Sequence, residues 1–405
     1  MKTLNILIFL FTAFTLHAQS PLYLNFVMHN EESDKNASNQ FYDQSQIFFN
    51  DSRAVLKEFA DTIVANSAAW NCESDWRFLD AVIKWDAHTG TGNQNIIEWL
   101  NAQNGIEIDP HAHQTSHNYA DVAYLIDSCG VTPSNNVGGF LYDTIVGGHN
   151  WCDMQNGMTA QMPPFHVWHP DVLWGGGSMN HGNDLNDYGA WKPDTLHNFY
   201  QHNASRHLIF IGNGCAPVLS DTSDVSNIVN QITTFVNYIS TGMFPINGFY
   251  CATIMTNLRD MNSAGIQKVS QVIHQLQPLI DSGKIVWANT TNKKDAWVSI
   301  FNSQPFQLSC GQMPNDVQTV SNEKVVNIFP NPSDGNISVS LPNISKSNAS
   351  IKIYTITGQI VFEKQFDQLQ SENSLHLQLN LTNGLYFCQW TDGTKTETQK
   401  ILIQN

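Results

Sequence analysis

The chain has 405 residues, enough for two or three domains and at least one large core. Its 35 acidic and 19 basic residues give a formal charge of −16, so nucleic acid is not expected as a partner, because binding it needs basic surfaces. Charged residues make up only 13% of the chain and aromatic residues 11%, a composition that suits an uncharged partner such as carbohydrate.

Residues 1–18 are predicted to be a secretory signal peptide. Lys2 provides a positive start, an apolar run from Leu4 to Leu16 follows, and Ala18 is a small residue before a cleavage point. The run is shorter than the ~20 apolar residues of a membrane-spanning helix, and no later segment is apolar for long enough. We therefore expect export without a transmembrane anchor. Disulfides are possible outside the cytoplasm, although seven cysteines cannot all pair within one chain.

Residues 19–310 show strand and helix patterns that alternate almost throughout. Strands are expected at 21–30, 106–109, 137–143, 206–212, 246–255 and 284–290. Helices are expected at 52–68, 75–85, 95–105, 116–130, 224–241, 264–283 and 292–303. This alternation favours an α/β fold with a parallel sheet that closes, or nearly closes, into a deformed (β/α)7-type barrel.

Residues 311–324 form a polar, pattern-free linker, and residues 325–405 contain short alternating strands separated by turns, as in a small all-β sandwich. The motifs "FPNPSDGNISVSLPN", "IYTITGQIV", "LNLTNGLYFCQW" and "KILIQ" occur there in this order. Together they resemble the C-terminal sorting domain of the type IX secretion system of Bacteroidetes. The resemblance implies recognition by that machinery and delivery to the outer-membrane surface or the medium. A carbohydrate-binding sandwich is the alternative.

Two of the expected strands end in clusters of potential metal ligands. These are His29, Glu31 and Glu32 after the first strand, and Asp109, His111, His113 and His117 after the strand at 106–109. Strand ends of this fold class collect functional residues, and imidazole with carboxylate suits Zn²⁺ or a similar divalent ion. His113 and His117 are four residues apart, so a helix that began at their level would point both rings to one side. The alternative is a set of solvated loop residues.

The histidine spacing carries a second resemblance, to the polysaccharide deacetylase family. "HQTSH" is similar to the pair of metal-binding histidines of that family, which implies His113 and His117 as ligands. "NEES" stands where the family has two aspartates, which by position implies Glu31 as the catalytic base and Glu32 as a ligand. Glu31 could instead be the ligand, with His29 or Glu32 as the base. The arginine motif and the late Leu-His motif of the family are not found.

A long aromatic segment, residues 165–191, is a further candidate for the site. Trp168 and Trp174 offer flat faces for a sugar, and His169 or His181 could protonate a leaving group. We also expect Asp109, His111 and His181 to contact the substrate or to support the metal ligands. The alternative is a loop packed by its own aromatic side chains.

The leading hypothesis is a secreted, metal-dependent hydrolase, Zn²⁺ being the expected ion, that removes N- or O-acetyl groups from a polysaccharide. A glycoside hydrolase is one alternative and would need two carboxylates on either side of the scissile bond, for example Glu31 and Asp109. The other alternative is a surface protein that binds carbohydrate without turnover.

Overall fold

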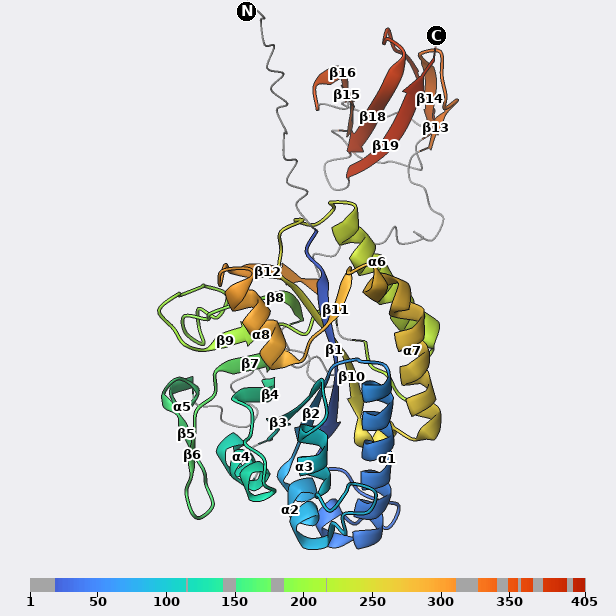
Figure 1. Ribbon diagram of the computed structural model, residues 1–405. Helices are drawn as coiled ribbons and strands as arrows, with labels where there is room; N and C mark the ends of the chain where they lie inside the picture. Colours follow the sequence, from blue (N-terminus) through green and yellow to red (C-terminus); the bar gives the residue numbers. More distant parts are fainter. Residues whose placement is uncertain are drawn as a thin grey trace, which may run out of the picture. The chain divides into compact units, whose positions relative to one another are not determined.

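The computed structural model describes residues 19–113, 116–140, 151–175, 186–215, 217–310, 327–340, 349–355, 358–366, 374–391 and 396–404 (Figure 1). The chain divides into two compact units, Met1–Met313 and Pro314–Asn405, and each is described by itself. The expected signal peptide, the expected linker 311–324 and His181 lie outside the described residues.

The first unit is built around a mainly parallel sheet with the order β10–β1–β2–β3. Its strands are β1 (Leu22–Asn30), β2 (Trp70–Ser74), β3 (Ile106–Pro110) and β10 (Tyr250–Asn257). The short strand β11 (Ile285–Trp287) also pairs with the first three residues of β1 in parallel. Expected strands at 21–30, 106–109, 246–255 and 284–290 are thereby confirmed, whereas β2 was not expected.

A second sheet has the order β12–β8–β9–β7–β4. Its strands are β4 (Asn136–Phe140), β7 (Val172–Gly175), β8 (Asp187–Trp191), β9 (Ile209–Ile211) and β12 (Phe306–Ser309). A single parallel bridge, His111–Gly138, joins the end of β3 to β4, and another, Val218–Met255, joins the segment after β9 to β10. Among the described residues of this unit the longer strands therefore lie in two sheets, and no closed barrel is found, whereas the sequence predicted a deformed barrel that closes or nearly closes. The antiparallel strands β8 and β12 interrupt the parallel order.

Helices cover the outer face of the first sheet (Figure 1). The helices of this unit are α1 (Gln46–Ala65), α2 (Trp76–Trp85), α3 (Ile96–Asn101), α4 (Tyr119–Ser128), α5 (Trp151–Asn156), α6 (Val225–Ser240), α7 (Ser263–Asp281) and α8 (Thr290–Ser299). Seven of them match expected helices, with ends that differ by a few residues. A two-stranded hairpin, β5 (Met158–Thr159) and β6 (Val167–Trp168), lies between α5 and β7. Cys215 and Cys310 form a disulfide that ties the segment after β9 to the end of β12.

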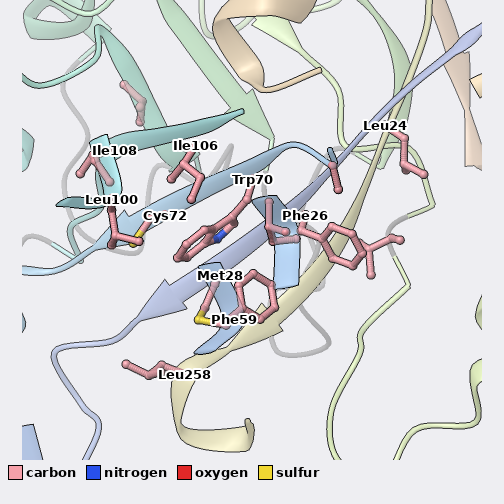
Figure 2. Close-up of a cluster of buried hydrophobic side chains, with 14 of the residues drawn as sticks. Leu24, Phe26, Met28, Phe59, Trp70, Cys72, Leu100, Ile106, Ile108 and Leu258 are labelled. Atoms are coloured by element: carbon pink, nitrogen blue, oxygen red, sulfur yellow. The ribbon is translucent and has the colours of Figure 1, made fainter. Parts of the chain in front are cut away.

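The two faces of β1 have different chemistry. Leu24, Phe26 and Met28 alternate along the strand and enter the main hydrophobic core beneath the helices, where Figure 2 shows Phe26 and Met28 close to Phe59 of α1. The residues between them point to the opposite, inner face, which looks toward the second sheet. That inner face carries polar groups as well as apolar ones, and every residue of β1 is buried. The functional candidates lie on this face.

The second unit consists of two antiparallel sheets that share one core. One sheet contains β13 (Asn327–Phe329), β14 (Asn336–Ser340) and β17 (Ser374–Gln378), and the other contains β15 (Ala349–Thr355), β16 (Ile360–Phe366), β18 (Gly384–Thr391) and β19 (Thr396–Ile403). Apolar residues alternate along these strands, so that side chains such as Val339, Ile353 and Ile401 fill the space between the sheets. The unit is the β-sandwich that the turn spacing predicted.

Candidate metal centre

The candidate site is built at the carboxyl ends of β1, β2 and β3. The register of the parallel strands aligns His29 with Glu73 and Glu73 with Asp109, so that these three side chains occupy one row on the inner face. The chain then leaves β1 toward Glu31 and leaves β3 toward His111. Side chains that are distant in sequence therefore meet at one edge of the sheet.

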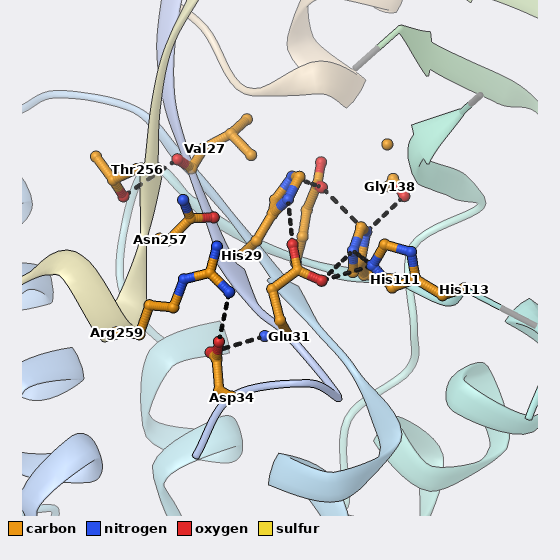
Figure 3. Close-up of polar contacts among 12 residues, drawn as sticks. Val27, His29, Glu31, Asp34, His111, His113, Gly138, Thr256, Asn257 and Arg259 are labelled. Carbon is orange, nitrogen blue, oxygen red and sulfur yellow. Dashed lines mark hydrogen bonds and ion pairs between the residues drawn. The ribbon is translucent and has the colours of Figure 1, made fainter. Parts of the chain in front are cut away.

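Three atoms that can bind a metal converge beside this row (Figure 3). Glu31 Oε2 lies 2.5 Å from His113 Nε2 and 3.4 Å from His111 Nε2. The two Nε2 atoms of His111 and His113 lie 3.1 Å apart. Two imidazole nitrogens and one carboxylate oxygen facing a common point are the donor set of a three-ligand catalytic zinc site.

The position of His111 is fixed by its other ring nitrogen. Nδ1 lies 2.9 Å from the carbonyl oxygen of Gly138, and this contact requires a proton on Nδ1. The lone pair of the neutral ring is then on Nε2, which faces Glu31 and His113. Glycines on β4 leave the necessary room, since a Cβ atom on Gly139, where φ is +71°, would lie 3.0 Å from His111 Cε1. A metal-binding histidine is typically oriented in this way.

A second, deeper pair lies next to these three residues. His29 Nε2 is 2.6 Å from Glu73 Oε2, and His29 Nδ1 is 3.2 Å from Glu31 Oε1. The Glu73 carboxylate is fully buried, and its contact with His29 lacks the alignment of a hydrogen bond. Burial would lower the pKa of His29, but the carboxylates of Glu73 and Glu31 raise it to about 10. The pair is thus a buried imidazolium–carboxylate ion pair beside the ligand atoms.

The charges of the cluster reinforce one another. Burial acts to raise the pKa of Glu31, yet the surrounding imidazoles, His111 foremost, hold it well below its usual range. Burial, together with the nearby charge of His29, lowers the pKa of His111. Burial acts in the same direction on His113, but its hydrogen bond to Glu31 raises the pKa overall. An ionised Glu31 is the protonation state that metal binding needs.

Glu32 and His117, which the resemblance implied as ligands, lie together in another place. The His117 ring stacks on Trp76, with 4.3 Å between the ring centroids and 16° between the planes. The indole nitrogen of Trp76 donates a hydrogen bond of 2.9 Å to Glu32 Oε2. Among the described residues, the groups that could hold a metal ion include neither Glu32 nor His117.

The other expected site residues divide in a similar way. Asp109 is fully buried and accepts hydrogen bonds from Asn71, Ser134 and Asn136, at 2.7, 2.5 and 3.2 Å. Burial, together with the nearby charge of Glu107, raises its pKa well above the usual range. Its oxygens are therefore occupied by partners within the protein. Asp109 supports the strands and is not turned toward the three ligand atoms.

The two tryptophans that were expected to bind a sugar are buried in the hydrophobic core. Trp168 and Trp174 are 4% and 0% exposed, so neither indole face is open to a sugar. Trp174 meets His29 edge-on at 6.2 Å between centroids and so forms part of the wall behind the buried pair. His169 is exposed on the β5–β6 hairpin, where its ring packs over Gly157.

The residues present fit a divalent metal. The set combines one carboxylate and two imidazoles, and the orientation of His111 is fixed by a hydrogen bond on the nitrogen away from the ligand atoms. The Nε2 atoms of His111 and His113 face each other, which is energetically unfavourable unless a proton or a cation lies between them. Glu31, His111 and His113 would hold the ion, and Zn²⁺ suits this donor set.

Comparison with known proteins identifies the second unit. Residues 327–404 match the model of a secretion system C-terminal sorting domain, which confirms the predicted type IX sorting domain and indicates export to the cell surface or beyond. No helix among the described residues has the length and apolar character needed to cross a membrane. No protein with curated annotation matches the chain.

Solved structures resemble the chain only weakly. A β-glucuronidase from Parabacteroides merdae is 17% identical over 20% of this chain and 13% of its own, with a TM-score of 0.17. A Parabacteroides distasonis protein, provisionally classed as a glycoside hydrolase/deacetylase, is 8% identical over 96% of this chain and 85% of its own, with a TM-score of 0.40. Likenesses at this level carry no argument about activity, so the function must be argued from the site.

Proposed function

We propose that residues 19–310 form a metal-dependent hydrolase that removes acetyl groups from a carbohydrate outside the cell. The observation that supports this most directly is the convergence of Glu31 Oε2, His111 Nε2 and His113 Nε2 at the carboxyl ends of β1 and β3. A bound Zn²⁺ would supply Lewis acidity, lowering the pKa of a water molecule and polarising a carbonyl group. The two sheets are taken as a deformed version of the (β/α)7-type barrel.

In this proposal Glu31 is a metal ligand, and His29 is the group that moves protons. His29 Nδ1 lies next to Glu31 Oε1, so the imidazole is beside the point where the ligand atoms meet. Glu73, on the far side of the ring, holds His29 in position and stabilises its charged form. As an imidazolium, His29 would act as the acid: it would donate a proton to the departing sugar oxygen or nitrogen, while the proton of the attacking water would pass to solvent and a solvent proton would restore the imidazolium.

The glycosidase alternative receives less support from the site. It requires two carboxylates on either side of a sugar bond, and Asp109 was the expected partner of Glu31. Asp109 is buried, and both of its oxygens accept hydrogen bonds from neighbouring side chains. A carboxylate in that environment is held away from a substrate.

The proposal is tested on the full chain after purification. We expect close to one equivalent of zinc by elemental analysis, and acetate release from acetylated glycans that a chelator abolishes and added Zn²⁺ restores. Release of reducing sugar ends without acetate would favour the glycosidase. Glycan binding with neither product and without bound metal would show that the protein is a non-catalytic binding protein.

A further inference from the structure

The Glu31 carboxylate reaches the ligand cluster from a turn, and this turn is held by one buried aspartate. Glu31 and Asp34 form a closed turn, in which the Asp34 amide donates to the Glu31 carbonyl oxygen at 3.1 Å. The Asp34 carboxylate folds back, and its Oδ2 accepts the Glu31 amide, also at 3.1 Å. Asp34 thus contacts both backbone polar groups of the residue that presents the proposed ligand.

The same carboxylate reaches two other parts of the fold. Tyr42, fully buried just before α1, donates its hydroxyl to Asp34 Oδ2 at 2.9 Å. Arg259, in the turn after β10, places Nη1 3.2 Å from Asp34 Oδ1, and Figure 3 shows this contact beside Glu31. Asp34 and Tyr42 are 1% and 0% exposed, so the bond between them forms away from water, whereas the Arg259 side chain is 43% exposed. One side chain therefore ties the Glu31 turn to elements on both sides of it.

We propose that Asp34 is a positioning residue for the Glu31 ligand, and that Arg259, in the turn after β10, helps to hold the Asp34 carboxylate in place. The inference rests on the proposed function, because it gives Glu31 the role of ligand. Without the Asp34 contacts, the turn would no longer hold the Glu31 carboxylate beside His111 and His113. Residues that orient ligands without touching the metal typically change metal affinity by about 10- to 100-fold.

A matched control is present in the same unit. Asp86 also has a buried side chain, 1% exposed, and pairs with Arg53 through an Nε–Oδ1 contact of 2.8 Å. It also accepts the backbone amides of His88 and Ile96, as Asp34 accepts that of Glu31. Its partners lie in α1 (Arg53), in the loop after α2 (His88) and at the start of α3 (Ile96), away from the Glu31 turn. Asp86→Ala therefore removes a buried carboxylate that is paired with an arginine and with backbone amides, without touching the turn that presents Glu31.

The experiment measures Zn²⁺ affinity by chelator competition, and the absorption spectrum of the Co²⁺-loaded protein, in the full chain. Asp34→Ala should weaken Zn²⁺ binding by about 10- to 100-fold and alter the Co²⁺ spectrum. Asp86→Ala should lower thermal stability and leave both metal readouts unchanged. Asp34→Asn keeps an oxygen for the Glu31 amide and should recover most of the affinity. If Asp34→Ala fails to fold, Asp34→Asn and Arg259→Met, both expected to show intermediate affinity, carry the test.

Three results would overturn the proposal, and they are distinguishable. Wild-type Zn²⁺ affinity in Asp34→Ala would show that Asp34 is not needed, while loss of zinc in His113→Ala would leave the proposed function standing. An equal loss of affinity in Asp34→Ala and Asp86→Ala would show a general effect of stability. Absence of zinc binding in the wild-type protein itself would end both this inference and the proposed function.

Discussion

Two groups of polar side chains lie on the same inner face of the β10–β1–β2–β3 sheet, and they differ in how completely they are paired. In the deeper network, Lys293 donates to Asn25 Oδ1 at 2.6 Å, and Asn25 donates to Asn71 Oδ1 at 2.7 Å. Asn71 in turn donates to Glu107 and Asp109 at 2.9 and 2.7 Å. Each side chain of this network finds an aligned partner within the protein.

The candidate metal-binding cluster, at the carboxyl end of the same strands, is less completely hydrogen-bonded. Both carboxylate oxygens of Glu73 and the Nε2 atom of His29 are buried without an aligned hydrogen bond. The His111 and His113 nitrogens face each other. Native interiors satisfy nearly all buried polar groups, so unsatisfied ones need an explanation such as catalysis or a bound ion. We therefore predict that the paired network contributes mainly to stability and that the incompletely paired cluster serves the proposed function.

The largest expected effect comes from removing a ligand of the cluster. His113→Ala should abolish bound zinc and reduce acetate release to background, because only two of three ligands remain. His113 suits the test better than His111, since its side chain is 29% exposed and its loss should spare the fold. Zinc content and circular dichroism are measured together. A folded His113→Ala variant that keeps zinc and activity would show that this cluster is not the metal site.

A smaller effect is expected at the base of the cluster. Glu73→Gln keeps the size of the side chain but removes the charge that pairs with His29. We expect zinc to stay bound and kcat to fall by about 10²- to 10⁴-fold, the usual contribution of a positioned acid or base. Glu107→Gln is the matched control, a buried glutamate of the paired network, and kcat per folded molecule should not change. Equal kcat values in the two variants would contradict the division of roles.

A substitution in the paired network should instead lower the free energy of unfolding and leave zinc binding unchanged. Asn71→Leu removes the amide that serves both Glu107 and Asp109, and it leaves these buried carboxylates short of donors. We expect the free energy of unfolding to fall by about 2–4 kcal/mol, measured by denaturant titration. The zinc content of the folded fraction should equal that of the wild type. Loss of zinc from a fully folded variant would show that the two groups are coupled.

The sequence predicts much of the fold. It predicts only part of the difference between the paired network and the candidate metal-binding cluster. The apolar patterns of β1, β3 and β10 and of the long helices α1, α6 and α7 are clear, because each buries a face of regular period. Strand β2, "WNCES", is only five residues long and was not predicted. The signal that could have predicted this strand is its alternation. Trp70 and Cys72 point toward the helices, and Asn71 and Glu73 point toward the inner face.

The ligand pair predicted from the sequence, His113 and His117, depended on the position at which the next helix begins. Pairing His113 with His117 assumed a helix at their level, with both rings on one side. Helix α4 begins only at Tyr119, and Asn118 caps it by accepting the amides of Ala120 and Asp121. The four-residue spacing therefore does not bring the two rings together. The second histidine of the cluster is His111, which immediately follows β3.

The smallest expected effect separates these two ligand sets. His117→Ala removes the ring that stacks on Trp76 and should lower the free energy of unfolding by about 1 kcal/mol, the usual value of one aromatic pair. Zinc content and acetate release should stay within about twofold of wild type, a difference below 0.5 kcal/mol. Since His113→Ala is expected to lose both, the two variants give opposite results if Glu31, His111 and His113 are the ligands. A zinc-free, folded His117→Ala variant would instead support the ligand pair implied by the family resemblance, and the contact with Trp76 would then belong to a metal-free arrangement of the loop.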